Sequence, residues 1–189
     1  MDRLIDVASV VIFISMIMYA AIKLDEAAKK LRDEEERIYR KETEMRRGFE
    51  KVSGYEYVNL PQRKTKQSAG YDIESAVDDV ITPGETKLIP TGLKAYMKPY
   101  EWLGIYIRSS IAVKHGIVLA NSVAVIDSDY YNNPDNEGHI LIAVRNTSKA
   151  VYKIRKGDRI AQGIFHQYYR VDGDKTDGKR IGGVGSTGK

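Results

Sequence analysis

The feature that most limits the fold is the pattern of apolar and turn-forming residues after residue 50. From there on, short runs of β-branched and aromatic residues alternate with Gly, Pro, Asn and Asp, and no long apolar helix pattern occurs. Such runs are typical of strands bounded by turns. We predict strands at residues 55–60, 86–89, 93–97, 102–107, 117–119, 123–126, 139–145 and 160–165. Many short strands without an internal repeat indicate an all-β sandwich or barrel.

The start of the chain is apolar. Residues 7–22 carry no charge, and Leu4 and Ile5 extend the apolar run. A helix that spans a bilayer needs roughly 20 apolar residues, with about 17 as the lower limit. We therefore predict an apolar helix over residues 1–23, and favour an uncleaved membrane anchor, with contact through residues 4–22, over a peripheral or buried helix. Basic residues follow the run, so the positive-inside rule places the rest of the protein in the cytoplasm.

The next segment is highly charged. Residues 24–50 are dense in Glu, Asp, Lys and Arg without proline, which predicts a charged helix that Gly48 ends. An apolar residue recurs every seven positions, at Leu24, Leu31, Ile38 and Met45. The companion heptad positions are mostly not apolar, so we favour an exposed single helix and keep a coiled coil as the alternative. Residues 51–189 then form the folded domain, with a flexible Gly-rich tail over about residues 173–189.

Composition excludes several kinds of chemistry. The 189 residues suit one domain with an appendage. The absence of cysteine excludes disulfides, thiol catalysis and thiolate metal sites. His115, His139 and His166 are far apart in sequence, so a zinc site is not expected. The net charge of +4 suits an anionic ligand, and we predict no nucleic-acid partner.

The stretch from Asn121 to Tyr130 contains the strongest candidate for a catalytic group. Asp127 directly follows the predicted strand at residues 123–126. A strand end holds a polar group in a fixed direction, which suits a catalytic acid or base. Taken alone, the segment Asp127-Ser128-Asp129 is more often a simple turn, because Asp and Ser are common turn formers.

Five segments in order resemble one family. They are Ala69–Ile73, Arg108–Ser110, Asn121–Tyr130, Lys156–Gln162 and Gly182–Gly188. In this order and spacing they are similar to the five motifs of the homotrimeric dUTP diphosphatases (dUTPases), and the resemblance covers about residues 55–189. Each motif alone is weak evidence for this family, whereas all five in this order are specific to it. The resemblance implies an all-β, jelly-roll-like (β-clip) subunit, dUTP as the substrate, and a homotrimer in which three subunits build each site.

The resemblance also implies roles at the third motif. Asp127 matches the family's general base, which activates a water for attack on the α-phosphorus and release of pyrophosphate. Tyr130 would lie against the deoxyribose and leave no room for a 2′-hydroxyl. Asn121 and neighbouring backbone groups would pair with the uracil edge, and Val125 and Ile126 belong to the same substrate-binding stretch.

Phosphate and metal roles are implied for the other motifs. Arg108, Ser109 and Gln162 resemble a phosphate-binding set in which the Arg mainly orders neighbouring acids, and Ser110 extends it. Asp72 resembles the acid that organises Mg²⁺ indirectly through water, so magnesium is the expected cofactor. The tail would close over the nucleotide through Val184, Gly185, Ser186 and Thr187, with the two hydroxyls on the terminal phosphate.

The sequence departs from the family pattern at several positions. Ala124 replaces a usual Gly, and Val184 replaces a Phe whose stacking on the base is worth roughly 1–3 kcal/mol, so weaker tail closure is expected. The family's tail Arg aligns with Lys179, but we favour its neighbour Arg180 because a guanidinium grips phosphate with two donors. Residues 131–138 are longer than the usual connection and predict a surface loop beside the site.

Two alternatives stay open from the sequence. A dCTP deaminase shares the fold and an Arg-Ser-Ser segment, although the complete Gly-Ser-Thr-Gly tail argues against it. A partner-binding regulatory protein on a dUTPase-like scaffold would account for the N-terminal helix and the long loop. We favour dUTP hydrolysis, which keeps uracil out of DNA and supplies dUMP for dTTP synthesis.

Overall fold

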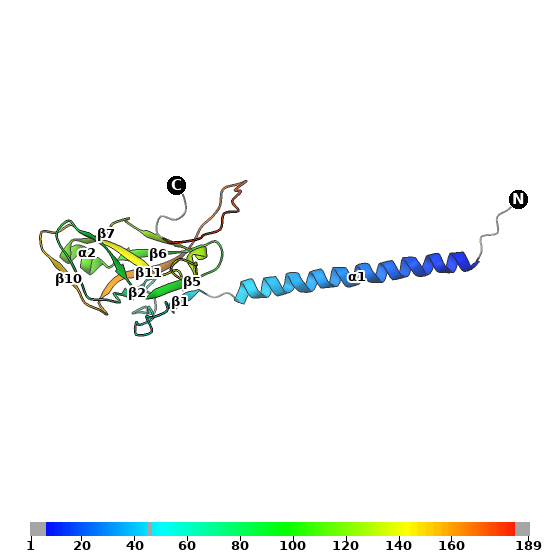
Figure 1. Cartoon of the computed structure of the whole chain (residues 1–189), viewed down its shortest axis with the longest axis horizontal. Helices are drawn as coiled ribbons and strands as arrows, with labels where there is room; N and C mark the ends of the chain where they lie inside the picture. Colours follow the sequence, from blue (N-terminus) through cyan, green and yellow to red (C-terminus); the bar gives the residue numbers. More distant parts are fainter. Residues whose placement is uncertain (1–6, 45–46, 184–189) are drawn as a thin grey trace. The chain divides into compact units, whose positions relative to one another are not determined.

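The chain folds as two units. The structure, a computed structural model, describes residues 7–44 and 47–183, and within the long helix it describes the side chains of residues 10–39. The division between a helical unit and a β-rich unit falls between residues 45 and 46 (Figure 1). The folded domain therefore begins several residues before the predicted boundary at residue 51.

The helical unit contains α1 (Val7–Glu44). The two helices expected over residues 1–23 and 24–50 form one continuous helix, since no Pro or Gly interrupts residues 7–44. Exposed ion pairs of the i,i+3 kind support its charged half, at Lys23–Glu26 (2.8 Å) and Glu34–Arg37 (3.0 Å). The coiled coil stays a prediction.

Membrane anchoring gains no support from α1. In the part of the chain that the structure describes, no helix has both the length and the apolar character needed to cross a bilayer, so neither the predicted anchor at residues 1–23 nor contact through residues 4–22 is supported. The cytoplasmic location stays a prediction.

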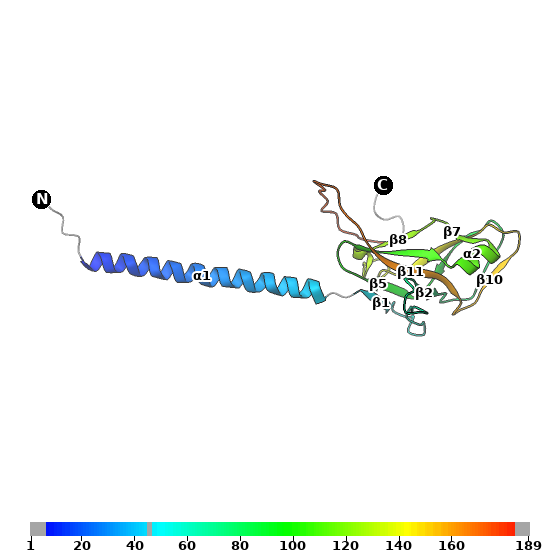
Figure 2. The ribbon, with the colours of Figure 1, turned by 180° about the vertical axis from the view of Figure 1, so that it is seen from behind.

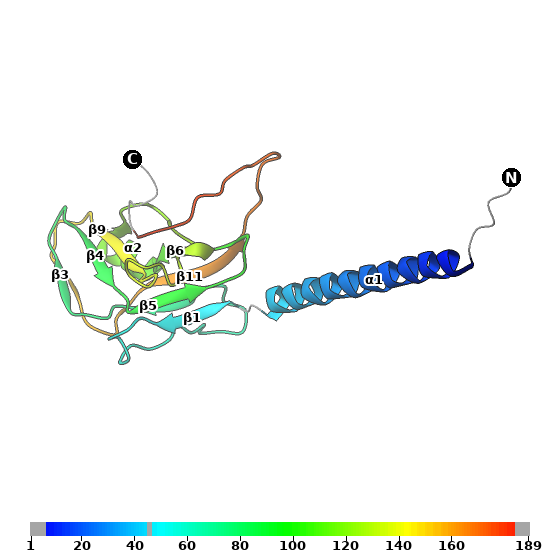
Figure 3. The ribbon, with the colours of Figure 1, turned by 45° about the vertical axis from the view of Figure 1, so that its right-hand side comes forward.

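Gly48 does not end the charged helix as predicted. It begins β1 (Gly48–Lys51), which pairs antiparallel with β5 (Leu93–Tyr96), as Figure 3 shows. A Cβ at Gly48 would lie 2.6 Å from the hydroxyl oxygen of Tyr96. The glycine is therefore suited to the close approach of a cross-strand ring rather than to a helix stop.

The main sheet of the β-rich unit carries most of the sequence motifs. Its antiparallel strands lie in the order β2 (Tyr71–Glu74), β11 (Arg159–Gln167), β6 (Glu101–Ile107) and β8 (Ala124–Asp127). Figure 2 labels β2, β11 and β8 of this sheet. β8 pairs only with β6 among the described strands, so it forms an edge of the sheet.

Smaller sheets complete the unit. One contains β4 (Thr86–Pro90), β9 (Leu141–Asn146) and β7 (Ile117–Leu119), in that order, and one pairs β3 (Asp79–Ile81) with β10 (Tyr152–Ile154). The described strands do not close into a barrel. The predicted fold class, mostly β with an added N-terminal helix, is confirmed.

A single apolar core fixes the sheets on one another. Leu103 and Ile105 of β6 are fully buried, and so are Ile89 of β4 and Ile142 of β9. They belong to one contiguous cluster, which holds the two larger sheets together. Burial of these alternating side chains fixes the register of β6, and with it the positions of its neighbours β8 and β11.

The sequence located most strands but not all. The predicted strands overlap β4, β5, β6, β7, β8, β9 and β11. The strand predicted at residues 55–60 is wrong, because that segment forms turns, with the Tyr55 N–H donating to the Val52 carbonyl (3.0 Å). Its tyrosine rings pack as a cluster instead, and Tyr55 lies 4.9 Å from His139 between ring centroids. The strands β1, β2, β3 and β10 were not predicted.

A short helix follows β6. The Arg108-Ser109-Ser110 motif does not simply close the strand, because α2 (Ser109–His115) begins at Ser109 with Arg108 as its N-cap residue. Gly116 ends α2 in the left-handed conformation (φ 63°), which glycine adopts without strain.

Candidate active site

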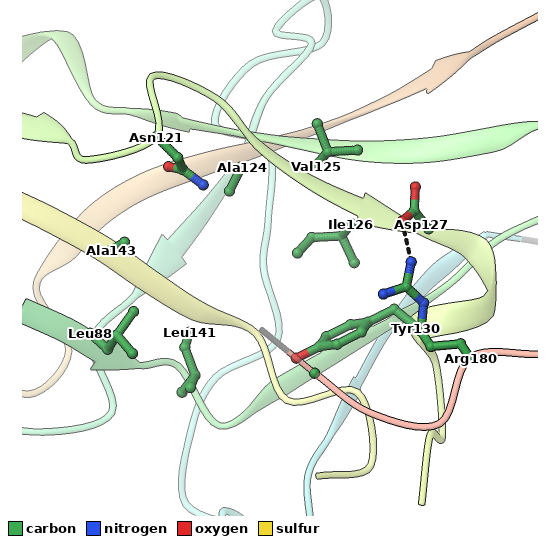
Figure 4. Close-up of a pocket in the computed structure, with 11 residues that line it drawn as sticks. Leu88, Asn121, Ala124, Val125, Ile126, Asp127, Tyr130, Leu141, Ala143 and Arg180 are labelled. Atoms are coloured by element: carbon green, nitrogen blue, oxygen red, sulfur yellow. Dashed lines mark hydrogen bonds and ion pairs between the residues drawn. The ribbon is translucent and has the colours of Figure 1, made fainter. Parts of the chain in front are cut away.

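A cavity of about 300 Å³ lies beside the edge strand β8. Several predicted substrate residues line it together, namely Asn121, Val125, Ile126, Asp127, Tyr130 and Arg180 (Figure 4). Leu88 of β4 and Leu141 and Ala143 of β9 supply an apolar side. A largely apolar pocket with a few polar groups is typical of a small-molecule site, and this volume lies at the lower end of such sites.

Asp127 is the last residue of β8. It lies opposite Trp102 at the start of β6, and the chain then turns into η1 (Ser128–Tyr130). Its carboxylate is half-exposed, at 49% of its side-chain surface. A rigid strand therefore places an accessible carboxylate at the mouth of the cavity, which a group that must reach water and substrate requires.

Tyr130 is held from both sides of its hydroxyl. The Tyr130 hydroxyl donates to the backbone carbonyl of His139 (2.9 Å) and accepts from Nδ2 of Asn136 (2.9 Å). Only 7% of Tyr130 is exposed. The ring is therefore a fixed wall of the cavity rather than a mobile one.

Arg180 connects the chain leading into the tail with two carboxylates at this cavity. Its Nε donates to Asp129 Oδ1 (2.8 Å) and its Nη2 donates to Asp127 Oδ2 (Figure 4). Its guanidinium carbon lies 5.7 Å from the ring centroid of Tyr130. Burial disfavours the charged form, but the hydrogen bond to Asp129 and the charges of both carboxylates outweigh it, so the pKa of Arg180 lies above its ordinary value.

A second polar group surrounds Asp72 on β2. Asp72 accepts from Nη1 of Arg159 (2.9 Å) and forms an ion pair with Arg108 (3.2 Å from Nε to Oδ1), and its side chain is 13% exposed. Gln162 of β11 lies opposite Asp72 in the sheet register. A Cβ at Gly70 would lie 2.3 Å from Oε1 of Gln162, so the glycine leaves room for that side chain. Ser109 and Ser110 begin α2 directly after Arg108.

The two groups lie at opposite ends of the main sheet. Asp127 pairs with Trp102, whereas Arg108 lies six residues further along the same chain, just beyond the end of β6. At about 3.3 Å per residue this places the two groups roughly 20 Å apart along the strand. A single chain therefore does not bring Asp127 together with Arg108, Gln162 and Asp72.

The last predicted substrate residues, Val184, Gly185, Ser186 and Thr187, lie outside the described residues. Of the two candidates for the tail cation, Lys179 is exposed, whereas Arg180 contacts the cavity. The predicted loop at residues 131–138 lies beside the cavity, and its Asn136 contacts Tyr130.

Sequence reasoning missed four polar residues at these groups. Arg159 stands inside the fourth motif, and Asp129 stands two residues after Asp127, so both were within quoted segments without a role. Asp135 and Asn136 belong to the long loop, which was noted only for its length. Their signal was weak because Asn and Asp are ordinary turn residues.

A magnesium ion fits this chain only in part. Among the described residues, no cluster of three or more His, Asp or Glu side chains is suited to hold a metal ion. Both oxygens of Asp72 pair with arginines, yet a carboxylate has about four lone-pair sites, so each oxygen can still accept from a water. The donor set therefore suits an ion that substrate phosphates carry and that keeps several waters, rather than an ion held by a cage of carboxylates.

His139 predicts a pH dependence of stability. Its Nε2 accepts from the Gly92 N–H (2.9 Å), and burial holds the pKa of His139 below its ordinary value of 6.5, while the charge of Glu137 opposes the shift. The folded state thus binds the proton less tightly than the unfolded state, so stability is complete above that value and decreases as pH falls below it.

We expect the free energy of unfolding by urea to fall between about pH 7.5 and about pH 5.5, above the range in which carboxylates titrate. The substitution His139→Gln keeps an acceptor without a titratable group, so it should flatten this dependence. An equally steep dependence in the variant would show that another group is responsible.

The fold and the cavity define the class of protein before any comparison. They show a mostly β-strand protein with a small pocket that has a half-exposed carboxylate in its lining. The family model described as dUTPase matches residues 56–188, so the chain belongs to the dUTPase family.

Individual relatives agree with this family. The deoxyuridine 5'-triphosphate nucleotidohydrolase of Lactococcus lactis subsp. lactis is 54% identical over 146 residues, which cover 75% of this chain and 97% of that protein. The crystal structure of the Streptococcus mutans dUTPase aligns with a TM-score of 0.63 and 44% identity over 67% of this chain and 99% of that chain. A mutant dUTPase from phage phi11 of S. aureus, with a coordinated structural Mg(II) ion, shares the fold at a TM-score of 0.58 and 20% identity, over 70% of this chain and 97% of that chain.

Proposed function

We propose that this protein hydrolyses dUTP to dUMP and pyrophosphate. The observation that carries the proposal is the position of Asp127, at the end of an edge strand and at the mouth of a cavity walled by Tyr130. The names of the Lactococcus and Streptococcus relatives support this activity over deamination of dCTP.

The cavity suits a deoxyuridine. An edge strand pairs through one side of its backbone only, so the other side of β8 can offer N–H and C=O groups to the edge of a base. Asn121 adds an amide at the same cavity. A cytosine in this position would leave buried polar groups unpaired, which costs about 1–3 kcal/mol for each group. The fixed ring of Tyr130 lies against the sugar and excludes a 2′-hydroxyl.

Asp127 acts as the general base. Its carboxylate accepts a proton from a water whose oxygen attacks the α-phosphorus, and the bond from that phosphorus to the α,β-bridging oxygen breaks. The electron pair leaves with pyrophosphate. Arg180 transfers its donors from Asp127 to the phosphate chain, which frees the carboxylate, and Ser109, Ser110 and Gln162 hold the phosphates. Val184, Gly185, Ser186 and Thr187 close over the nucleotide. Magnesium, when bound with the substrate, supplies further neutralisation of phosphate charge, and Asp72 orients its waters.

The active form is a homotrimer. The separation of roughly 20 Å between the Asp127 group and the Arg108 group, estimated from the rise per residue of a strand, supports this proposal, because one copy cannot offer both to one nucleotide. In an assembly, the Asp127 cavity of one subunit meets the phosphate-binding residues of a second.

The test is pyrophosphate release from dUTP, with dCTP, dTTP and UTP in parallel and with or without Mg²⁺. We expect release from dUTP alone, and greater release with Mg²⁺. Ammonia release from dCTP would replace the proposal with a deaminase. Absence of release from all four nucleotides, in a protein shown to be trimeric by light scattering, would contradict the proposed activity.

A further inference from the structure

The long loop at residues 131–138 is held together by hydrogen bonds to one buried side chain. Asn133 is buried at its centre, with 5% of its surface exposed. The Asn133 side chain donates to the Tyr130 carbonyl (2.9 Å) and to Oδ1 of Asn136 (2.8 Å), and it accepts from the N–H groups of Asp135 (3.1 Å) and Asn136 (3.2 Å). These bonds give the loop one shape and fix the positions of Asp135 and Asn136.

Those two side chains face the chain that leads into the tail. Oδ2 of Asp135 accepts from the backbone N–H of Gly183 (3.3 Å). Gly183 packs closely against the loop, because a Cβ there would lie 2.9 Å from Nδ2 of Asn136 and 3.4 Å from the hydroxyl oxygen of Tyr130. A side chain at this position would therefore either displace the Asn136 amide, which donates to the Tyr130 hydroxyl (2.9 Å), or move Gly183 away from the loop.

The tail is thereby held at two points around the cavity. Arg180 contacts Asp127 and Asp129 at one side, and three residues later Gly183 contacts the loop at the other. Both Arg180 and Gly183 line the cavity.

We propose that the loop at residues 131–138 is the docking site for the chain that leads into the tail, and that Asp135 is a positioning residue that receives the Gly183 N–H and holds this segment at the cavity. This proposal rests on the proposed function for its kinetic effect only. Docking itself is a property of the free protein.

The test compares Asp135→Ala and Gly183→Ala with two controls. Asp135→Asn keeps an acceptor oxygen at the same place and should behave as the wild type. Glu137→Gln changes a carboxylate of the same loop that pairs with Lys94 (3.3 Å) rather than with the tail, and it should also behave as the wild type. Every copy in an assembly carries the substitution, so the result does not depend on whether the tail docks on its own loop or on that of a neighbour.

The first readout needs no nucleotide. Limited trypsin digestion of the full chain, followed by mass spectrometry, measures the rate of cleavage after Lys179 and Arg180. We expect faster cleavage in Asp135→Ala and in Gly183→Ala, and no further acceleration in the double variant, because both remove the same contact. Unchanged cleavage in both single variants, or additive acceleration in the double variant, would overturn the docking contact.

The second readout is the steady-state hydrolysis of dUTP. Losing one hydrogen bond to a carboxylate should raise KM by about 5-fold in Asp135→Ala, with a smaller change in kcat. Asp135→Asn should restore KM, and a kcat loss without a KM change would overturn the positioning role. If the wild type releases no pyrophosphate while Asp135→Ala still accelerates tail cleavage, the proposed function fails and the docking site stands.

Discussion

Replacement of Asp127 by Asn should lower kcat for dUTP by about 1,000-fold, within the range of roughly 100- to 10,000-fold that a general base contributes. The amide has the shape of the carboxylate but cannot take a proton from water. The site would still hold the base and sugar through β8 and Tyr130, which the substitution leaves in place. Binding of a non-hydrolysable analogue, α,β-imido-dUTP, measured by calorimetry, should therefore change by less than about 3-fold.

A matched control separates base catalysis from charge pairing. Asp129 also binds Arg180, through Nε at 2.8 Å, but it lies two residues beyond the strand end. Asp129→Asn should therefore cause a loss of kcat well below that of Asp127→Asn. If the two variants lost activity equally, or if Asp127→Asn also abolished analogue binding, the carboxylate would be a structural partner of Arg180 rather than the base.

Replacement of Arg180 by Ala should lower kcat/KM for dUTP by about 100-fold, since charge-assisted hydrogen bonds to phosphate are worth roughly 1.5–3 kcal/mol each. Arg180 lines the cavity and can transfer its donors from the carboxylates to the phosphates. Lys179→Ala is the control, because Lys179 is exposed, and its kcat/KM should stay within about 3-fold of the wild type. Arg180→Lys should recover only part of the loss, because one ammonium does not replace a two-donor fork.

Binding of the product dUMP tests which phosphates Arg180 contacts. Inhibition by dUMP, which lacks the β- and γ-phosphates, should be nearly unchanged in Arg180→Ala if the guanidinium acts on the terminal phosphates. A stronger effect of Lys179→Ala than of Arg180→Ala would instead assign the tail cation to Lys179, the position that aligns with the family's arginine.

The fold class could be read from the sequence because its signal is local. Strands β6, β9 and β11 each contain several apolar, β-branched or aromatic residues, so each is recognisable without knowledge of its partner. Strand β2 and strand β3 are short and contain acids, so their assignment depends on the neighbour they pair with. Residues 55–60 failed in the opposite sense, since their tyrosines have strand propensity but pack as a ring cluster.

The cavity residues were predictable to the extent that motif order revealed them. Asp127, Tyr130 and Asn121 come from one continuous stretch, and the structure brings them to one pocket. The boundary of the folded domain was not predictable in this way. A glycine after a charged helical segment is typical of a helix end, which is why Gly48 was predicted to end the helix. Only the ring of Tyr96 on the neighbouring strand shows why a glycine stands there.

The sequence by itself determined the β-rich class, the long helix, the family resemblance and the chemical identity of the candidate groups, because each follows from local pattern or motif order. The tertiary structure decided which of these groups meet. Arg159 reaches Asp72 across 87 residues, and Arg180 reaches Asp129 across 51. It also decided that Asp127 and Arg108 lie at opposite ends of one sheet and that the tail rests on Asp135. These contacts depend on strand register and loop path, which are set by burial of the whole core and not by any single segment.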